Sequence, residues 1–343
     1  MMALDAGRSA SRSDQLPWLL PGLGLLVAAL MLLSLGVGEA PISLVSAASS
    51  LLAGESTLET LLLLELRLPR ALLGALVGAS LGLSGAAMQG FLRNPLAEPG
   101  VIGVSSCAAF GAVVALYSGL SLTFPLALPL GGMGGALLSV LFLHLLAGRE
   151  ATTLSLILAG VAINAFAAAL TSLALNLAPN PYAALEIVFW IMGSLADRTM
   201  EHVQLVAPIM LLGGLLLISG SRGLDALTLG EETAASLGID LGRLRLKLVL
   251  GTAMMVGSAV AVSGAIGFVG LVVPHFLRPF VGQRPAQLLP ASALGGAALL
   301  LAADLLVRLM PIGPELKLGV VTALIGAPCF LVLLRRLRRE LPD

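Results

Sequence analysis

The sequence predicts an all-α integral membrane protein with ten transmembrane helices, and its composition is the first reason. Of the 343 residues, 58% are hydrophobic and 11% are charged, whereas a soluble domain carries about a quarter charged residues. Long uncharged stretches need an apolar solvent, which a lipid bilayer supplies. Backbone groups in lipid must hydrogen-bond within their own segment, so we expect helical spans. The 40 glycines agree, because small residues let membrane helices approach closely.

The first span is expected in the apolar run 15–38, which follows Arg8 and Arg12. Basic residues followed by an apolar run are also the pattern of a signal peptide. The run is longer than a typical signal-peptide core and has no clear small-residue cleavage site, so we expect a retained span. Residues 1–14 then form a cytoplasmic tail.

Charged residues divide the rest of the chain into further spans. Residues 71–92 predict the second span, the uncharged stretch 99–148 predicts two more, and the stretch 151–185 holds a fifth that breaks at residues 178–181. The piece 187–196 is too short to cross a bilayer. The following spans are expected at residues 202–221, 248–277 (one long span, or two reaching Arg284), 285–303 and 318–334. Glycines within residues 264–270 favour a break that divides the long stretch in two.

The basic residues select ten spans over nine. Positive charge near span ends favours the cytoplasm, so the amino terminus and the basic tail, residues 335–343, are both expected inside. Two cytoplasmic ends require an even number of crossings. In the ten-span arrangement, fourteen of the 19 Lys and Arg residues fall on the cytoplasmic side. The sequence therefore predicts a multi-pass inner-membrane domain over residues 15–334.

Several other function classes find no support in the sequence. The formal net charge of zero argues against nucleic-acid binding. The three histidines lie far apart, so we expect no bound metal ion. No Gly-x-x-x-x-Gly-Lys-Ser/Thr phosphate loop occurs, so any ATP hydrolysis belongs to another chain. The sequence has no clustered acid, base or nucleophile, and we expect neither catalytic residues nor a cofactor on this chain.

The loop between the sixth and seventh spans predicts a short capped helix. Thr228 and Glu231 match a capping box, and Glu232 adds negative charge to the first turn. Gly238 can end this helix in a left-handed conformation, and Asp240 can cap the next one. Docking to a partner protein and a simple connector are equally good interpretations of this helix.

Charged residues near the outer ends of two spans invite a functional interpretation. Arg67 and Arg70 precede the second span and can share a helix face, where their guanidinium forks would suit carboxylates. Interfacial anchoring of the span is the commoner role. Asp304 and Arg308 are spaced i,i+4 in the ninth span and predict a structural pair, because a charge at the bilayer centre costs roughly 2.5–3.5 kcal/mol.

Two further segments are expected to shape the interior. The prolines and glycine of residues 94–100 prevent a plain helix, so this segment either lines the pathway or forms an interfacial turn. Gly74, Gly78 and Gly82 form a small-residue face on the second span, which predicts tight packing within the chain.

Eight motifs, in order along residues 60–334, together resemble the permeases of iron-siderophore, haem and cobalamin ABC importers. They are residues 66–70 (LRLPR), 84–89 (SGAAMQ), 94–100 (NPLAEPG), 158–162 (LAGVA), 190–194 (WIMGS), 229–238 (LGEETAASLG), 267–275 (GFVGLVVPH) and 319–328 (GVVTALIGAP). The resemblance implies the fold of a type II ABC importer permease with ten spans per subunit. It also implies a homodimer, two ATPase subunits that bind ATP and Mg²⁺, and one periplasmic substrate-binding protein.

The resemblance also implies roles for particular residues. Docking of the binding protein would fall to Arg67, Arg70 and Arg308. Residues 224–242 would be the cytoplasmic coupling segment, with the ATPase contact at Glu231, Glu232, Ala235, Leu237 and Gly238. The inner gate region is matched by Asn94 and Leu96, and a second gate segment, more loosely, by Thr152 and Thr153.

One position departs from the family pattern. The family usually has Glu-Leu-Pro-Ile/Val-Gly before the tenth span, and here the segment is Glu-Leu-Lys-Leu-Gly at residues 315–319. Lys317 adds a positive charge on the outer face. It either strengthens docking to an acidic partner or anchors the span.

The expected function is that of a permease of an ATP-driven importer. It would move an iron complex (siderophore or haem) or cobalamin from periplasm to cytoplasm by alternating access, and most of the family carries iron. The main alternative is an ion-coupled secondary transporter without an ATPase partner, for which Asp304 is the best functional carboxylate. An integral-membrane enzyme is a further alternative that the lack of a clustered site disfavours.

Overall fold

The computed structural model describes residues 16–38, 40–147, 153–282, 284–310 and 315–340, and within these ranges the chain forms helices and turns without a strand. The longer helices are α2 (Leu16–Gly36), α5 (Leu68–Phe91), α6 (Val104–Tyr117), α8 (Ala127–Ala147), α9 (Thr153–Asn176), α10 (Pro181–Ile191), α11 (Met200–Ser219), α14 (Leu241–Ser263), α15 (Val269–Leu277), α16 (Pro285–Leu309) and α17 (Leu318–Glu340). The short helices are α3 (Leu44–Leu52), α4 (Leu58–Leu61), α7 (Leu120–Thr123), α12 (Ser221–Leu227) and α13 (Glu231–Ser236).

Seven helices in the described part of the chain are long and apolar enough to cross a membrane. They are α2, the helix that ends as α5, α8, α9, α11, α14 and α16. Four shorter apolar helices accompany them, namely α6, α10, α15 and α17. Each predicted span overlaps one of these helices, and α10 covers part of the piece that the sequence marks as too short to cross.

The second long helix begins well before the predicted residue 71. Residues Leu58–Phe91 form one continuous apolar helix, with a π-helical section at Leu62–Arg67 between α4 and α5. Arg67 and Arg70 do not end the helix, because groups of neighbouring segments bind both guanidiniums. Pro69 lies in the first turn of α5, a position at which proline is tolerated.

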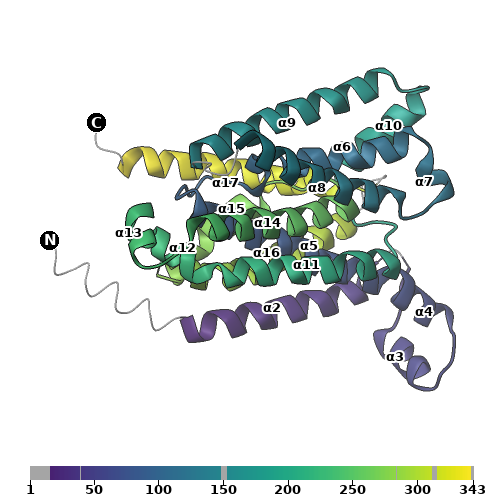
Figure 1. Ribbon diagram of the computed structural model, residues 1–343. Coiled ribbons are helices and arrows are strands. Elements are labelled where there is room, and N and C mark those ends of the chain that lie inside the picture. The colour runs from purple at the N-terminus through teal and green to yellow at the C-terminus, as the bar shows by residue number, and fades with distance from the viewer. Residues whose placement is uncertain (1–15, 39, 148–152, 283, 311–314, 341–343) are drawn as a thin grey trace.

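Helices α5, α14 and α16 form the buried centre of the bundle, while α2 and α9 run along opposite edges (Figure 1). Glycines allow α5 and α16 to touch through their backbones. A Cβ atom on Gly78 would lie 2.3 Å from the carbonyl oxygen of Gly296, and one on Gly82 would lie 2.0 Å from that of Ser292. The predicted packing of this glycine face within the chain is confirmed.

The predicted break in residues 264–270 is also confirmed, since α14 ends at Ser263 and α15 begins at Val269. Gly264 has a φ of 72°, and a Cβ atom there would lie 2.2 Å from the carbonyl oxygen of Trp190. Both facts require glycine at this position.

Pro274 lies inside α15 and cannot donate a hydrogen bond to the carbonyl of Gly270 one turn earlier. The amide of Gln89 on α5 supplies the missing donor, with Nε2 lying 3.4 Å from the Gly270 oxygen and 3.2 Å from the Leu271 oxygen. Arg278 in turn donates to Oε1 of Gln89 at 2.6 Å. This network ties the short helix α15 to the centre of the bundle.

The two ends of the bundle differ in content. Helix α2 begins and α17 ends at the end that carries α12 and α13, whereas α3, α4 and α7 lie at the opposite end (Figure 1). Functional groups predicted for the two membrane faces are therefore found at opposite ends of the molecule.

Candidate functional site

Buried charge is concentrated where α5 and α16 meet, at the α4 end of the bundle. The side chain of Asp304 is 2% exposed. Arg70 donates to its Oδ1 from Nε at 3.0 Å and from Nη2 at 2.8 Å, and Nε of Arg308 lies 3.1 Å from Oδ2. Nη2 of Arg70 also donates to Oε1 of Glu315. We call these four residues the arginine–carboxylate cluster, and its Asp304–Arg308 contact confirms the predicted i,i+4 pair.

Two arginines cap the end of α2. The acceptors are backbone carbonyl oxygens: Arg67 binds those of Leu35 and Gly36 (both 2.8 Å) and of Ala40, and Arg308 binds those of Ser34 (3.0 Å) and Val37 (2.8 Å). Cations at a helix carboxyl end satisfy the last carbonyls and oppose the negative end of the helix dipole. Arg67 is buried and has a capping role that the sequence does not reveal. Its role in docking stays a prediction.

A hollow of about 430 Å³ opens beside the cluster. Its charged lining consists of Arg67, Arg70, Asp197, Arg198, Arg308 and Glu315. Burial lowers the pKa of Arg198, and the charge of Asp197 partly offsets this shift. Guanidinium groups stay protonated in proteins, so the hollow contains more fixed positive than negative charge. Such a surface suits carboxylate groups of a partner.

Lys317 lies apart from the three arginines of the predicted docking site. Its Nζ lies 5.6 Å from the ring centroid of Phe189 on α10, within cation–π range. It lines a second cavity of about 510 Å³, together with Tyr182 and Trp190. Asp197 and Arg198 line both cavities, so Lys317 lies beside the hollow of the cluster.

Helix α13 lies at the opposite end of the bundle. Glu231 and Glu232 occupy its first turn, Gly238 follows it with a φ of 83°, and Asp240 caps α14 by accepting a 3.0 Å hydrogen bond from the Arg243 N–H. These three expectations are confirmed. The capping box is wrong, because the residue at the N-cap is Gly230, whose φ is 104°. Thr228 instead ends α12, where its hydroxyl donates to the Asp225 carbonyl at 2.7 Å.

One residue of α13 contacts the second gate segment and the residue that directly precedes the first. Oε1 of Glu231 accepts a 3.2 Å hydrogen bond from Oγ1 of Thr153, the first residue of α9. The same oxygen lies 3.6 Å from Nη2 of Arg93, next to Asn94. Ala234 packs inward. The residues exposed to solvent include Glu232, Ala235, Leu237 and Gly238. The exposed side of α13 is therefore free to contact another protein. Thr152 lies outside the described residues.

The segment after α5 begins with turns at the surface, where Asn94 is exposed, and then passes into the interior, where Ala97 and Pro99 are buried. Asn94 starts it with an Oδ1 that accepts the Leu96 N–H at 2.9 Å. Further on, Glu98 accepts the Phe268 N–H at 3.1 Å, at the start of α15. A Cβ atom on Gly270 would lie 2.8 Å from Pro99 and 2.9 Å from the carbonyl oxygen of Leu81 in the middle of α5. The irregular backbone predicted for residues 94–100 is confirmed.

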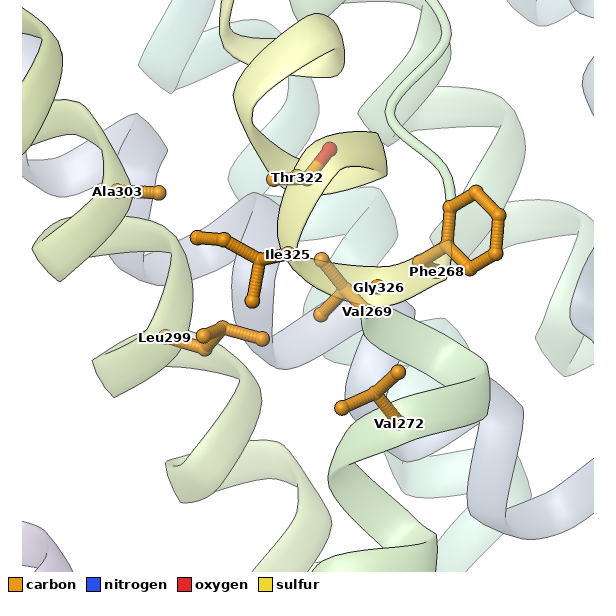
Figure 2. Close-up of a pocket in the computed structure, with 8 residues that line it drawn as sticks. All are labelled: Phe268, Val269, Val272, Leu299, Ala303, Thr322, Ile325 and Gly326. Carbon is orange, nitrogen blue, oxygen red and sulfur yellow. The ribbon is translucent and has the colours of Figure 1, made fainter. Parts of the chain in front are cut away.

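Helices α15, α16 and α17 enclose a small apolar cavity (Figure 2). Figure 2 shows Ile325 and Leu299 facing each other across it, with Phe268 beside Gly326. The cavity holds about 10 Å³, room for a single water at most. A Cβ atom on Gly326 would lie 2.3 Å from that of Phe268, so this is a packing contact and not a ligand site.

Some members of these sites were not predicted. Glu98 belongs to the motif at residues 94–100 and Glu315 to the segment 315–319 before the tenth span, but their partners, the Phe268 N–H and Arg70, are 170 and 245 residues away along the chain. A single sequence contains no signal for such distant pairs. The motif at residues 94–100 and the family pattern before the tenth span could have marked the two glutamates as candidates without naming their partners.

The FecCD transport family matches residues 25–336, which is most of the chain. The chain belongs to this family. Among its FecCD relatives, the vitamin B12 import system permease protein BtuC of Vibrio cholerae is 44% identical over 93% of each chain. The Fe(3+) dicitrate transport system permease protein FecD of Escherichia coli is 39% identical over 92% of this chain and 97% of its own. The hemin transport system permease protein HmuU of Yersinia pestis is 38% identical, over 91% and 95%.

A solved structure agrees with the FecCD assignment. It is an inward-facing conformation of an ABC transporter of the metal-chelate type, with a TM-score of 0.82 and 34% sequence identity, and the match covers 93% of this chain and 99% of that one. This chain is therefore an ABC importer permease of the FecCD family, and the expected resemblance is confirmed.

Proposed function

We propose that this FecCD permease is the ten-span membrane subunit of an importer for a metal chelate: an iron–siderophore complex, haem or cobalamin. The supporting observation is the family match along nearly the whole chain, with relatives that serve vitamin B12, hemin and ferric dicitrate import. As a homodimer it would work with two ATPase subunits and a periplasmic binding protein. It would sit in the inner membrane and pass the chelate to the cytoplasm by alternating access.

The two ends of the bundle fit these partners. The α13 end would face the cytoplasm, where Leu237, 63% exposed, and its neighbours would contact the ATPase. Both chain termini would then be cytoplasmic, because α2 begins and α17 ends there (Figure 1). The hollow beside the arginine–carboxylate cluster would face the periplasm and receive acidic residues of the binding protein, with Arg70 as the main contact and Lys317 beside it.

Glu231 would transmit ATPase motion to the gates. It contacts Thr153 and Arg93, so a displacement of α13 acts on the start of α9 and on the segment of Asn94 and Leu96 together. The rival ion-coupled mechanism needs a carboxylate that binds and releases a cation. Asp304, its best candidate, is held by Arg70 and Arg308, and this argues against the rival.

Uptake into reconstituted vesicles tests the proposal. Vesicles would contain the permease alone or with its ATPase subunits, and a loaded binding protein would be added outside with labelled ferric siderophore, haem or cobalamin in parallel. We expect accumulation only with the ATPase and ATP, for one of the three chelates. Accumulation at the full rate by the permease alone would refute the proposal.

A further inference from the structure

Arg70 is held by two carboxylates of different character. Asp304 projects from the carboxyl-terminal part of the packed helix α16, is 2% exposed, and accepts hydrogen bonds from both Nε and Nη2 of Arg70. Glu315 lies three residues before α17, is 33% exposed, and receives Nη2 alone. The inner carboxylate therefore fixes the guanidinium, and the outer one covers the side that faces the hollow.

Charge in the hollow depends on Glu315. Four guanidiniums and two carboxylates line it, and Glu315 is one of the two. If its side chain turned outward, Arg70 would present a bonding edge to the hollow and the positive excess would grow by one. A carboxylate from another protein would then find a fork-shaped donor already oriented by Asp304.

We propose that Glu315 is a resident carboxylate that occupies Arg70 in the undocked permease and gives way to a carboxylate of the binding protein. Docking is then an exchange of carboxylates on one guanidinium, and this inference rests on the proposed function. Arg70 keeps its buried counter-charge, Asp304, throughout the exchange. It also limits affinity, since the incoming group must displace one already present, and this favours release of the empty binding protein.

Glu315 and not Asp304 is the group that exchanges. Removing Asp304 from Arg70 would break several contacts at once and leave a buried carboxylate beside Arg308 alone. Turning Glu315 away breaks one contact of a half-exposed side chain, and such contacts contribute little to stability.

Docking affinity of the E315Q variant tests the exchange. The permease–ATPase complex in nanodiscs would be titrated with the periplasmic binding protein of its importer, by biolayer interferometry at low and high salt. Because Gln competes weakly for a guanidinium, we expect E315Q to dock about fivefold more tightly than the unchanged protein. E55Q is the matched control: it removes one exposed carboxylate between α3 and α4, at the same end of the bundle, and should change docking little.

A second measurement needs no partner protein. Phenylglyoxal modifies accessible arginines, and mass spectrometry would report the rate at each site. Arg70 should react several times faster in E315Q than in E55Q, while Arg308, which Glu315 does not bind, should keep its rate. Docking of E315Q that is equal to or weaker than that of E55Q, or an unchanged Arg70 rate, would overturn the exchange while leaving the importer function intact. Absence of docking in every variant would refute the proposed function and the exchange with it.

Discussion

Asp304 shows what one buried carboxylate does among several guanidiniums. The sequence predicts its pair with Arg308 because four residues separate them on one helix, and the structure confirms it. Its second partner, Arg70, is 234 residues away, and only the packing of α5 on α16 brings the two together. At the residue scale, local pairs were therefore predictable, whereas the partners of Arg70, Arg67 and Glu98 were not.

Replacing Asp304 with Asn should destabilise the permease strongly. Arg70 and Arg308 would lose their common buried counter-charge, and breaking one side of such a network costs about 3 kcal/mol. The loss is measured by thermal unfolding in detergent. E65Q, which removes an exposed carboxylate from the adjoining π-helical section, should unfold at nearly the unchanged temperature. Equal behaviour of the two variants would contradict the role assigned to Asp304.

At the scale of the element, helix ends follow local chemistry and were largely predictable. Asp240 caps α14, Gly238 ends the α13 turn, and the glycines after Ser263 separate α14 from α15. The capping box at Thr228 failed because the preceding helix α12 extends up to that residue and a glycine makes the turn into α13. A motif of two residues cannot tell the end of one helix from the start of the next.

The close contact between α5 and α16 predicts that one added methyl group there lowers the stability of the protein. G78A would place a Cβ atom 2.3 Å from the Gly296 oxygen, and overpacking of this kind costs about 1–3 kcal/mol. We expect lower thermal stability and reduced yield of folded protein. G22A in α2 makes the same change where no atom lies within 4 Å and should leave stability unchanged or slightly raised.

Reversing both charges of the Arg93–Glu231 pair should restore the coupling that either single reversal weakens. R93E and E231R should each lower the ratio of chelate transported to ATP hydrolysed, because each places like charges 3.6 Å apart. The exposed pair is worth less than about 1 kcal/mol, so the loss should be a few-fold. The double variant R93E/E231R should recover much of it, and E231R combined with R243E, whose partner is Asp240, should not. Equal ratios in the two double variants would rule out the link.

At the scale of the whole molecule, the all-helical class and the order of the apolar helices were predictable from charge and hydropathy, whereas the count of ten spans stays a prediction, because seven described helices are long enough to cross a membrane and four apolar ones are shorter. The packing of the helices against one another was not predictable, because the hydropathy of a helix face does not indicate which other helix packs against it. Backbone contacts at Gly78, Gly264 and Gly270 decide that placement. The forty glycines in the sequence indicate close helix packing but do not indicate which helices are in contact.

Cysteine labelling tests the arrangement of the bundle across the membrane. Cys107 and Cys329 are free thiols and would first be replaced by alanine. A membrane-impermeant maleimide should then label E55C in intact cells, and T233C on α13 only after the membrane is opened. Labelling of T233C from outside would reverse the orientation proposed here.

The separation of Arg70 from Asp304 along the chain has a consequence for biogenesis. Arg67 meets the carboxyl end of α2 as soon as α5 is inserted, because both segments leave the ribosome early. Arg70 must wait for α16, so for most of translation its guanidinium has no counter-charge and is drawn toward lipid headgroups. Nascent chains that stop before residue 285 would keep Arg70 without the carboxylate that fixes it in the finished bundle.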